Sequence, residues 1–443
     1  MIGMRLTILG GGGFRVPLIH RAVAARPELG IDEIVLHDVD PARSTVIAAV
    51  LAAAGDGPRV SAEASLEAAV AGSDMVFSAI RVGGAAGRVR DERRALAAGV
   101  LGQETVGAGG LAFALRTLPV ALEQARVVRA VTPDAWLINF TNPAGLVTEG
   151  LRTVLGDRVV GICDSPIGLI RRACRALGVD AAQVQYDYLG INHLGWLRSL
   201  RIGNRELLPQ LLSDDHALES FEEGRLFGGP LLRALGALPN EYAYFYYAAN
   251  DLLRKLEHAP TRGEVVAADQ SAFYAAAAGA APAVARALWA DTRLRREESY
   301  LAETRAPGEQ RDQADLAGGG YEEVAVDLIG ALSAGRPTRA IVNVPNGSAV
   351  PQLPADLVLE VPCLVDSGGP RPLPVAPPEL HQLGLMASVR AAERAVITAI
   401  IDGSREQALR ALTIHPLIGS PRVARELLDT VLTDYPQLGL LLT

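Results

Sequence analysis

The alternation of short apolar runs with longer helical patterns over the first 165 residues is the feature that most constrains the fold. Apolar and β-branched runs typical of buried strands lie at 5–9, 33–38, 75–80, 135–140 and 158–163. The patterns between them predict helices at 16–25, 41–54, 111–131 and 143–155. Strands and helices that alternate in this way build a parallel sheet covered on both faces. We therefore predict an α/β fold with a doubly wound parallel sheet.

The alternation stops near residue 186, which predicts a second domain. Two extended segments flank His193, and patterns rich in Ala, Leu, Glu and Arg then predict helices at 241–255, 264–277, 282–303 and 322–334. Two short strands at 340–344 and 357–361, a proline-rich loop at 370–378 and closing helices complete the chain. We predict a Rossmann-like domain, similar to that of lactate and malate dehydrogenases, over residues 1–185. A mostly helical α+β domain for substrate binding and oligomerisation is expected over residues 186–443.

Charge and hydropathy exclude several classes of partner. The net charge of −8 comes without a basic cluster, so no nucleic-acid partner is expected. The Ala-rich run near residues 275–290 is interrupted by Pro282 and Arg286, so no membrane helix is expected. The first residues are typical of a strand that ends in glycines and not of a signal peptide, which predicts a cytoplasmic protein. Its three cysteines are then expected to be free thiols.

The stretch "LGGGGFRVP" follows the first predicted strand and opens the first predicted helix. Backbone N–H groups in such a loop can bind a pyrophosphate, which makes the four glycines candidates for a dinucleotide site: Gly10, Gly11, Gly12 and Gly13. The spacing departs from G-x-G-x-x-G, because Arg15 stands at the sixth position. A tight glycine turn without a cofactor is the alternative.

Asp38 strengthens the cofactor interpretation. It ends the second predicted strand in "IVLHDVD", where a carboxylate can accept from the ribose hydroxyls of NAD and would repel the 2′-phosphate of NADP. We therefore predict NAD. The alternative role for Asp38 is a helix N-cap, which Asp40 before Pro41 could fill instead.

Several further stretches, taken together and in order, indicate one protein family. They are "IRVGG", "GQETVGAGG", "NFTNPAG", "GICDSPIG", "GINHLGW", "PNEYAYFYY", "TRGEVV" and "LEVPCLV". In this order the chain resembles the family-four glycoside hydrolases, most of all the 6-phospho-β-glucosidases, over nearly its whole length. The resemblance implies dependence on NAD and on a divalent metal, with a phosphorylated glucoside as the small-molecule partner. It also implies a homodimer or homotetramer.

The resemblance implies that Cys163 and His193, at neighbouring strand ends, are the two protein ligands of a divalent metal, which is usually manganese in this family. A thiolate and an imidazole would also bind zinc, nickel or cobalt, and two ligands leave positions open for substrate oxygens. Without the resemblance, a buried hydrophobic cysteine and a core histidine would be the ordinary interpretation.

The reaction that the resemblance implies is a redox-assisted elimination and not a displacement at the anomeric carbon. It runs through transient oxidation at sugar C3 by NAD, removal of the C2 proton, loss of the C1 substituent and addition of water. Tyr242 is the candidate base, with Tyr244, Tyr246 and Tyr247 as alternatives on an aromatic helix face. Asp164 is the candidate proton donor to the departing oxygen, and a helix N-cap is its alternative role.

The remaining site residues also rest on the resemblance. Arg88, Asn142 and Arg262 match substrate contacts of the family, and the guanidinium fork of Arg262 suits a phosphate. Arg81 in "IRVGG" is assigned to the cofactor, whereas Glu104 in "GQET" receives no definite role. The arginines have ordinary surface or capping roles as alternatives.

The chain departs from the family pattern in the glycine loop. Gly13 and Phe14 stand where a serine is usual, and Ala108 replaces a usual proline. The lost hydroxyl puts the preference for a 6-phosphate in question. Two other functions remain as alternatives: an NAD-dependent 2-hydroxyacid dehydrogenase, and a catalytically silent sugar or nucleotide sensor.

Overall fold

Six parallel strands form the N-terminal part of the sheet in the computed structural model, which describes residues 3–55, 57–256, 259–300, 305, 310–311 and 320–443. They lie side by side in the order β3-β2-β1-β4-β5-β6. Their bounds are β1 Met4–Leu9, β2 Ile31–His37, β3 Arg59–Ala62, β4 Met75–Ser78, β5 Trp136–Asn139 and β6 Val159–Gly161. This is the doubly wound order, with a reversal between β1 and β4, and it confirms the predicted fold class.

The C-terminal half continues the same sheet in antiparallel fashion. β11 pairs with β6, and β12, β7, β8 and β10 follow in that order, with β13 beside β12 and β9 beside β8. The bounds are β7 Gln185–Ile191, β8 Leu194–Ile202, β9 Arg205–Glu206, β10 Leu238–Pro239, β11 Thr338–Pro345, β12 Val358–Asp366 and β13 Gly369–Pro372. Because one sheet runs through both halves, the division at residues 185 and 186 stays a prediction.

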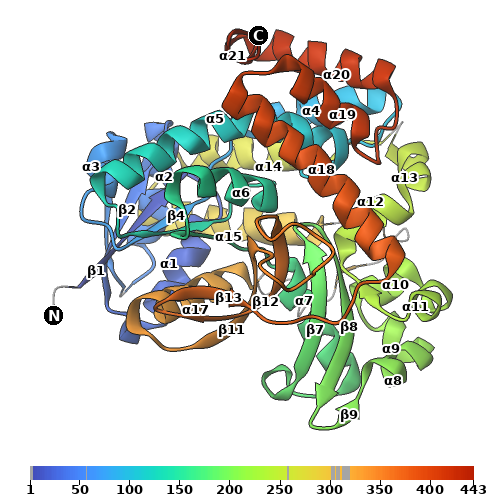
Figure 1. The fold of residues 1–443 in the computed structure, drawn as a ribbon. Coiled ribbons are helices and arrows are strands. Elements are labelled where there is room, and N and C mark those ends of the chain that lie inside the picture. The colour runs from blue at the N-terminus through green and yellow to red at the C-terminus, as the bar shows by residue number, and fades with distance from the viewer. Residues whose placement is uncertain (1–2, 56, 257–258, 301–304, 306–309, 312–319) are drawn as a thin grey trace.

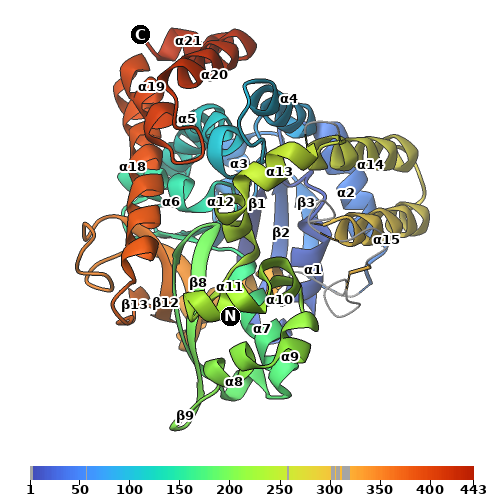
Figure 2. The same cartoon turned by 90° about the vertical axis from the view of Figure 1, so that its right-hand side faces the viewer.

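Helices cover both faces of the sheet (Figures 1 and 2). Those of the N-terminal half are α1 Val16–Ala24, α2 Pro41–Ala52, α3 Leu66–Val70, α4 Gly84–Ala97, α5 Gly107–Val131, α6 Ala144–Leu155 and α7 Ser165–Leu177. Short 3₁₀ turns lie at η1 Pro27–Leu29, η2 Ala181–Gln183 and η3 Glu241–Ala243. The middle of the chain adds α8 Leu208–Ser213, α9 Asp215–Glu219, α10 Glu222–Phe227, α11 Gly229–Leu235, α12 Tyr244–Tyr247, α13 Ala249–Leu256, α14 Arg262–Ala277 and α15 Pro282–Glu298. The last helices are α17 Tyr321–Ala334, α18 Leu380–Asp402, α19 Arg405–Ile414, α20 Pro421–Asp434 and α21 Pro436–Leu441.

Side-chain alternation along the strands divides the core into two clusters. Met75 and Phe77 of β4 point into the cluster that includes α1, α2 and α17, whereas Val76 between them points into the cluster with α5, α6 and α18. The second cluster also takes in α19 and α20, which lie at the top of Figure 1. Both faces of the central strands are therefore buried, as the continuous apolar runs predict.

Several predicted elements differ from the structure. The helix predicted at 241–255 is three pieces, η3, α12 and α13, because Asn240 caps the first turn and Ala248 leaves the helical conformation. β3, α3 and α4 were not predicted, and β3 has only four partly exposed residues. The predicted proline-rich loop begins inside β13, an edge strand, where prolines are tolerated. The last residues of the helix predicted at 282–303 lie outside the described residues.

In the described ranges, no helix has an apolar stretch long enough to cross a bilayer.

Candidate active site

The glycine loop after β1 lies at the strand-order reversal between β1 and β4, where ligands bind in doubly wound sheets. Gly10 has φ +84°, and a Cβ there would lie 2.6 Å from the carbonyl oxygen of Ala79. A Cβ on Gly13 would lie 2.8 Å from the carbonyl oxygen of Gly10. These two positions require glycine, and both residues line the cavity described below.

The two middle glycines serve packing. A Cβ would lie 2.7 Å from Cβ of Leu36 at Gly11 and 2.8 Å from Cβ of Arg43 at Gly12. Neither glycine is among the residues that line the cavity. Their small size lets the loop lie directly against β2 and α2.

Asp38 is held beside this loop and does not cap a helix. Its carboxylate accepts hydrogen bonds from the backbone N–H of Gly12 at 2.9 Å and of Asp40 at 3.0 Å. Asp40 caps α2 by accepting from the N–H groups of Ala42 and Arg43. The alternative capping role therefore belongs to Asp40. Asp38 does not line the cavity itself.

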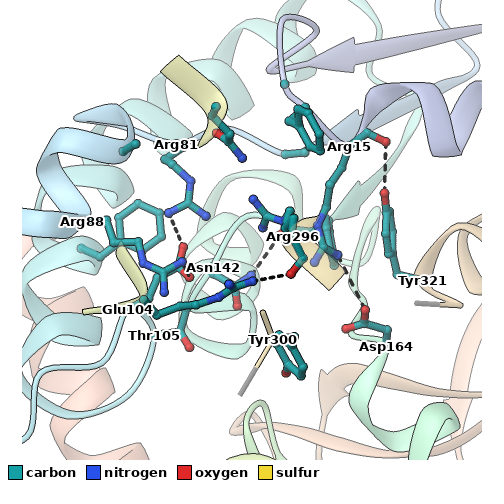
Figure 3. A pocket seen from close by; sticks show the side chains of 18 of the residues that line it. Arg15, Arg81, Arg88, Glu104, Thr105, Asn142, Asp164, Arg296, Tyr300 and Tyr321 are labelled. Atoms are coloured by element: carbon teal, nitrogen blue, oxygen red, sulfur yellow. Dashed lines mark hydrogen bonds and ion pairs between the residues drawn. The ribbon is translucent and has the colours of Figure 1, made fainter. Parts of the chain in front are cut away.

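One cavity brings together ten of the predicted site residues. They are Gly10, Gly13, Arg81, Arg88, Asn142, Cys163, Asp164, His193, Tyr242 and Arg262. These residues follow β1, β4, β5 and β6 or lie in α4, in the β7–β8 turn, in η3 and at the start of α14. Figure 3 shows several of them pointing toward a common space. Side chains that are far apart in the sequence thus converge on one site.

Cys163 follows β6, and His193 forms the turn between β7 and β8. The expectation of neighbouring strand ends is wrong, because β11 and β12 lie between β6 and β7 in the sheet. His193 has φ +65°, which is unusual for a residue with a side chain and occurs where the surroundings impose it. This turn directs the imidazole into the cavity that Cys163 also lines.

The donor set of this pair fits a divalent metal. Nδ1 of His193 lies 2.7 Å from the hydroxyl of Thr105, which leaves Nε2 for a ligand. Burial lowers the pKa of His193 to about 3, so the imidazole is neutral, as a metal ligand must be. Among the described residues, no three His, Cys, Asp or Glu side chains are grouped to hold an ion. A metal on Cys163 and His193 would therefore keep positions open for other oxygens.

Tyr242 is the tyrosine of its cluster that reaches this site. Its ring stacks on His193 with 3.7 Å between ring centroids and an angle of 10° between the planes. The three alternative tyrosines do not line the cavity and pack against Phe227, His415 and Trp196 instead: Tyr244, Tyr246 and Tyr247. Geometry thus favours Tyr242 over its neighbours.

Tyr242 needs a further group nearby that lowers the pKa of its phenol if it is to act as a base. Burial, together with Glu241 and Cys163, raises the pKa of this phenol well above its ordinary value, which opposes a role as a base. A divalent cation held by Cys163 and His193 would lower that pKa, because it favours the phenolate. The base and the metal are therefore expected to function only together.

Asp164 stands at the N-cap position of α7, but its side chain makes no capping hydrogen bond. Its carboxylate instead forms an ion pair with Arg15 at 3.7 Å, drawn as a dashed line in Figure 3. Arg15 packs over the rings of Phe140 and Tyr321. The alternative role of Asp164 as a cap is thus not observed.

Arg81 and Arg88 both bind Glu104, which gives this carboxylate a definite place. Arg88 also pairs with Glu92, at 2.7 Å. Although burial opposes it, the two arginines lower the pKa of Glu104, so it is ionised. Glu104 therefore fixes two guanidinium groups at one wall of the cavity, as Figure 3 shows.

Arg262 lies beside a second arginine that the sequence did not single out. Arg262 donates to the hydroxyl of Ser299 and, at 2.7 Å, to the carbonyl oxygen of Arg296. Arg296 of α15 lines the cavity, and within the described chain its guanidinium forms no ion pair with a carboxylate. Burial, then Arg15 and Arg262, lower the pKa of Arg296 to about 9. A cation destabilised by two other cations is suited to an anionic ligand.

Two models of known protein families match this chain and show the family to which it belongs. The model described as "Family 4 glycosyl hydrolase" matches residues 5–179, and that of the "Family 4 glycosyl hydrolase C-terminal domain" matches residues 188–418. The chain belongs to glycoside hydrolase family 4. It is therefore a glycosidase, and the resemblance seen in the sequence motifs is confirmed.

Individual family 4 members align over almost the whole chain. A Bacillus subtilis relative named "Probable 6-phospho-beta-glucosidase" is 30% identical over 97% of this chain and 96% of its own length. A "Maltose-6'-phosphate glucosidase" of the same organism is 27% identical over 96% of this chain and 94% of its own. The 6-phospho-beta-glucosidase structure from Thermotoga maritima with manganese, NAD⁺ and glucose-6-phosphate superposes with a TM-score of 0.82. It is 26% identical and covers 98% of this chain and 99% of its own.

Four residues at this family 4 site were missed from the sequence: Arg15, Thr105, Arg296 and Tyr300. Thr105 stands inside the quoted motif "GQET", and Arg15 directly follows the glycine loop and Phe14, so both could have been proposed from their position. Arg296 and Tyr300 lie at the end of an arginine-rich helix and just beyond it, with no local pattern that distinguishes them. Only the three-dimensional structure brings them to the cavity.

Proposed function

We propose that this family 4 enzyme hydrolyses 6-phospho-β-glucosides and depends on NAD and a divalent metal, with manganese as the expected ion. The observation that carries the proposal is the convergence of Cys163, His193, Tyr242 and Asp164 on one cavity beside the glycine loop. The relatives' names support a phosphorylated glucoside as substrate, and the solved Thermotoga structure holds NAD⁺ and manganese.

The positions of the side chains around the cavity support the proposed roles. Bound NAD supplies a reversible hydride acceptor for sugar C3, and the metal supplies a Lewis acid for the neighbouring sugar oxygens. Tyr242, as the phenolate, removes the proton from C2, and Asp164, in its protonated carboxylic acid form, gives its proton to the glycosidic oxygen as the bond to C1 breaks. Arg15 holds the Asp164 carboxylate at the cavity wall until substrate arrives. Asn142 and Arg88 bind sugar hydroxyls, and Arg81 lies toward the cofactor.

The phosphate is assigned to the side of the cavity where Arg262 and Arg296 lie. Phe14 has no hydroxyl to replace that of the family's usual serine. Its ring instead packs edge-on against Phe273, with 5.4 Å between ring centroids. Arg296 supports the assignment, because burial and the neighbouring Arg15 and Arg262 lower its pKa and a dianion would stabilise its charged form. The arginine pair would thus compensate for the lost serine.

The experiment that tests this function is a hydrolysis assay on paired nitrophenyl β-glucosides, with and without the 6-phosphate. Turnover of the phosphorylated compound is expected only when both NAD and Mn²⁺ are supplied, without net formation of NADH. Net NADH formation from 2-hydroxyacids would support the dehydrogenase alternative. Ligand binding without turnover of any glycoside would support the sensor alternative.

Three further expectations belong to the same proposal. The enzyme is expected in the cytoplasm, where a reducing environment keeps the thiol of Cys163 available as a ligand. It is expected to assemble as a homodimer or homotetramer. Residues 1–185 are expected to bind NAD, and residues 186–443 to complete the substrate site.

A further inference from the structure

A buried carboxyl group lies in the middle of the sheet, outside the cavity and the proposed chemistry. Glu360 of β12 is fully buried, as are its chain neighbours Leu359 and Val361. Its oxygens accept hydrogen bonds from Asn343 and Tyr188, and within the described chain no arginine or histidine forms an ion pair with it. An apolar side chain of similar volume would stabilise the sheet as well or better. Stability alone therefore does not account for Glu360.

The strands around Glu360 leave room for polar side chains at this level of the sheet. Cross-strand partners form one row through five neighbouring strands: Gly161 of β6, Asn343 of β11, Glu360 of β12, Gly190 of β7 and Gly195 of β8. A Cβ on Gly161 would lie 2.8 Å from Cβ of Asn343, and a Cβ on Gly195 would overlap the hydroxyl oxygen of Tyr188. Both positions thus need glycine so that these polar side chains fit beside Glu360.

A chain of hydrogen bonds leads from Glu360 to η3, the turn that carries Tyr242. The hydroxyl of Tyr188 donates to Oε2 of Glu360 at 3.3 Å, and the side-chain amide of Asn240 donates to that hydroxyl oxygen at 3.2 Å. Oδ1 of Asn240 accepts from the backbone N–H of Ala243 at 3.1 Å and so caps η3. Tyr188 and Asn240 are both fully buried. The centre of the sheet is thus connected to the segment of the proposed base.

The same groups hold the strand that leads to His193. Tyr188 and Gly190 belong to β7, Gly190 pairs with Glu360 across the sheet, and His193 follows in the turn to β8. Glu360 is therefore joined by one route to the base and by another to the strand before the proposed metal ligand. None of Glu360, Tyr188 and Asn240 lines the cavity. Their effect on the reaction must act through the side chains that do.

The ring of Tyr242 needs such support. It faces the imidazole of His193 with 3.7 Å between centroids and 10° between planes, whereas aromatic pairs left to themselves prefer offset or edge-on arrangements. A catalytic group misplaced by about 1 Å loses on the order of a hundredfold in rate. We infer that Glu360, Tyr188 and Asn240 are positioning residues that hold the ring of Tyr242 against His193. This inference rests on the proposed function, in which Tyr242 removes the C2 proton.

Tyr188→Phe tests the inference, because it keeps the ring and removes the hydroxyl between Glu360 and Asn240. In hydrolysis of a 6-phospho-β-glucoside with NAD and Mn²⁺, kcat is expected to fall about tenfold, while KM and the affinity for NAD stay within about twofold. The isotope effect of deuterium at C2 on kcat should be at least as large as in the unaltered enzyme, since proton removal is the step that slows. Tyr186→Phe, the same substitution two residues earlier in β7, is the matched control and should change none of these values.

Asn240→Ser is a second variant that interrupts the chain at another point. Serine can still cap η3 but has no amide to donate to Tyr188, so the same loss in kcat is expected. An unchanged kcat in either variant, a loss that appears in KM instead, or a smaller isotope effect would overturn the inference and leave the proposed function standing. Absence of turnover by the unaltered enzyme would overturn the proposed function, and this inference with it.

Discussion

The hydroxyl of Thr105 lies 2.7 Å from Nδ1 of His193 and fixes the imidazole so that Nε2 remains for a metal. Residues that orient a metal ligand in this way contribute strongly to affinity. Thr105→Val, which keeps the shape and removes the hydroxyl, is expected to weaken Mn²⁺ binding about 10- to 100-fold, as measured by calorimetric titration. Thr105→Ser should retain most of the affinity. Equal affinity in all three proteins would show that the hydrogen bond does not orient the ligand.

Removal of the Tyr242 hydroxyl tests the proposed base. Tyr242→Phe keeps the stack on His193 and is expected to lower kcat by on the order of 10²- to 10⁴-fold, as expected for the loss of a general base. Tyr246→Phe is the control, because that ring packs against His415 outside the cavity. A similar loss in both variants, or in neither, would contradict the assignment to Tyr242.

Asp38 tests the cofactor assignment. Asp38→Asn removes the charge that would hold the ribose hydroxyls, so NAD affinity is expected to fall about tenfold. Because the same charge would repel the 2′-phosphate of NADP, the preference for NAD over NADP is expected to decrease as well. Asp40→Asn is a matched control two residues away, because asparagine caps a helix as well as aspartate does. Tryptophan fluorescence titrations with NAD and NADP measure both effects. A larger loss of NAD affinity in the Asp40 variant would contradict the model of the site.

The buried Glu360 predicts a pH dependence of stability. Burial raises its pKa to about 8, although Asn343 and Tyr188 donate to its carboxylate at 3.0 and 3.3 Å. An acid whose pKa is higher in the folded state than in the unfolded state binds more protons when folded. Its contribution to the free energy of unfolding is therefore fully present below the unfolded pKa, near 4.5, and decreases as the pH rises to about 8.

Glu360→Gln should lack this component. Denaturant unfolding between pH 5 and pH 9 is expected to show a smaller decrease of stability with rising pH than in the unaltered protein. Glu123→Gln, at an exposed position of α5, is the control and should follow the unaltered protein. Parallel pH profiles for all three proteins would show that Glu360 does not titrate in this range.

The parallel half of the fold could be predicted because its signal is local. Each buried strand is a continuous apolar run, and the turn residues between elements mark the boundaries, as at Gly10 after β1. The insertion of β11 and β12 between β6 and β7 could not be predicted in the same way. Those pairings join residues such as Asn343 and Gly161, which no sequence pattern relates. The expectation that Cys163 and His193 lie at neighbouring strand ends was wrong for this reason.

In the site, too, residues in local motifs could be predicted from the sequence, whereas those that depend on long-range packing could not. Motifs identified Cys163 and His193, because a motif keeps its residues together along the chain. The choice of Tyr242 among four tyrosines depends on which ring points into the cavity, and Tyr242 lies in η3 whereas the other three lie in α12. Arg296 lies 34 residues beyond Arg262 and reaches it only through the packing of α15 against α14.

We expect cleavage to proceed through removal of the C2 proton beside a metal on Cys163 and His193. The most direct test of this expectation is turnover of a 6-phospho-β-glucoside in D₂O with NAD and Mn²⁺, followed by NMR of the released sugar. Deuterium is expected at C2 of the product. A product that retains its original hydrogen at C2 while hydrolysis proceeds would contradict it.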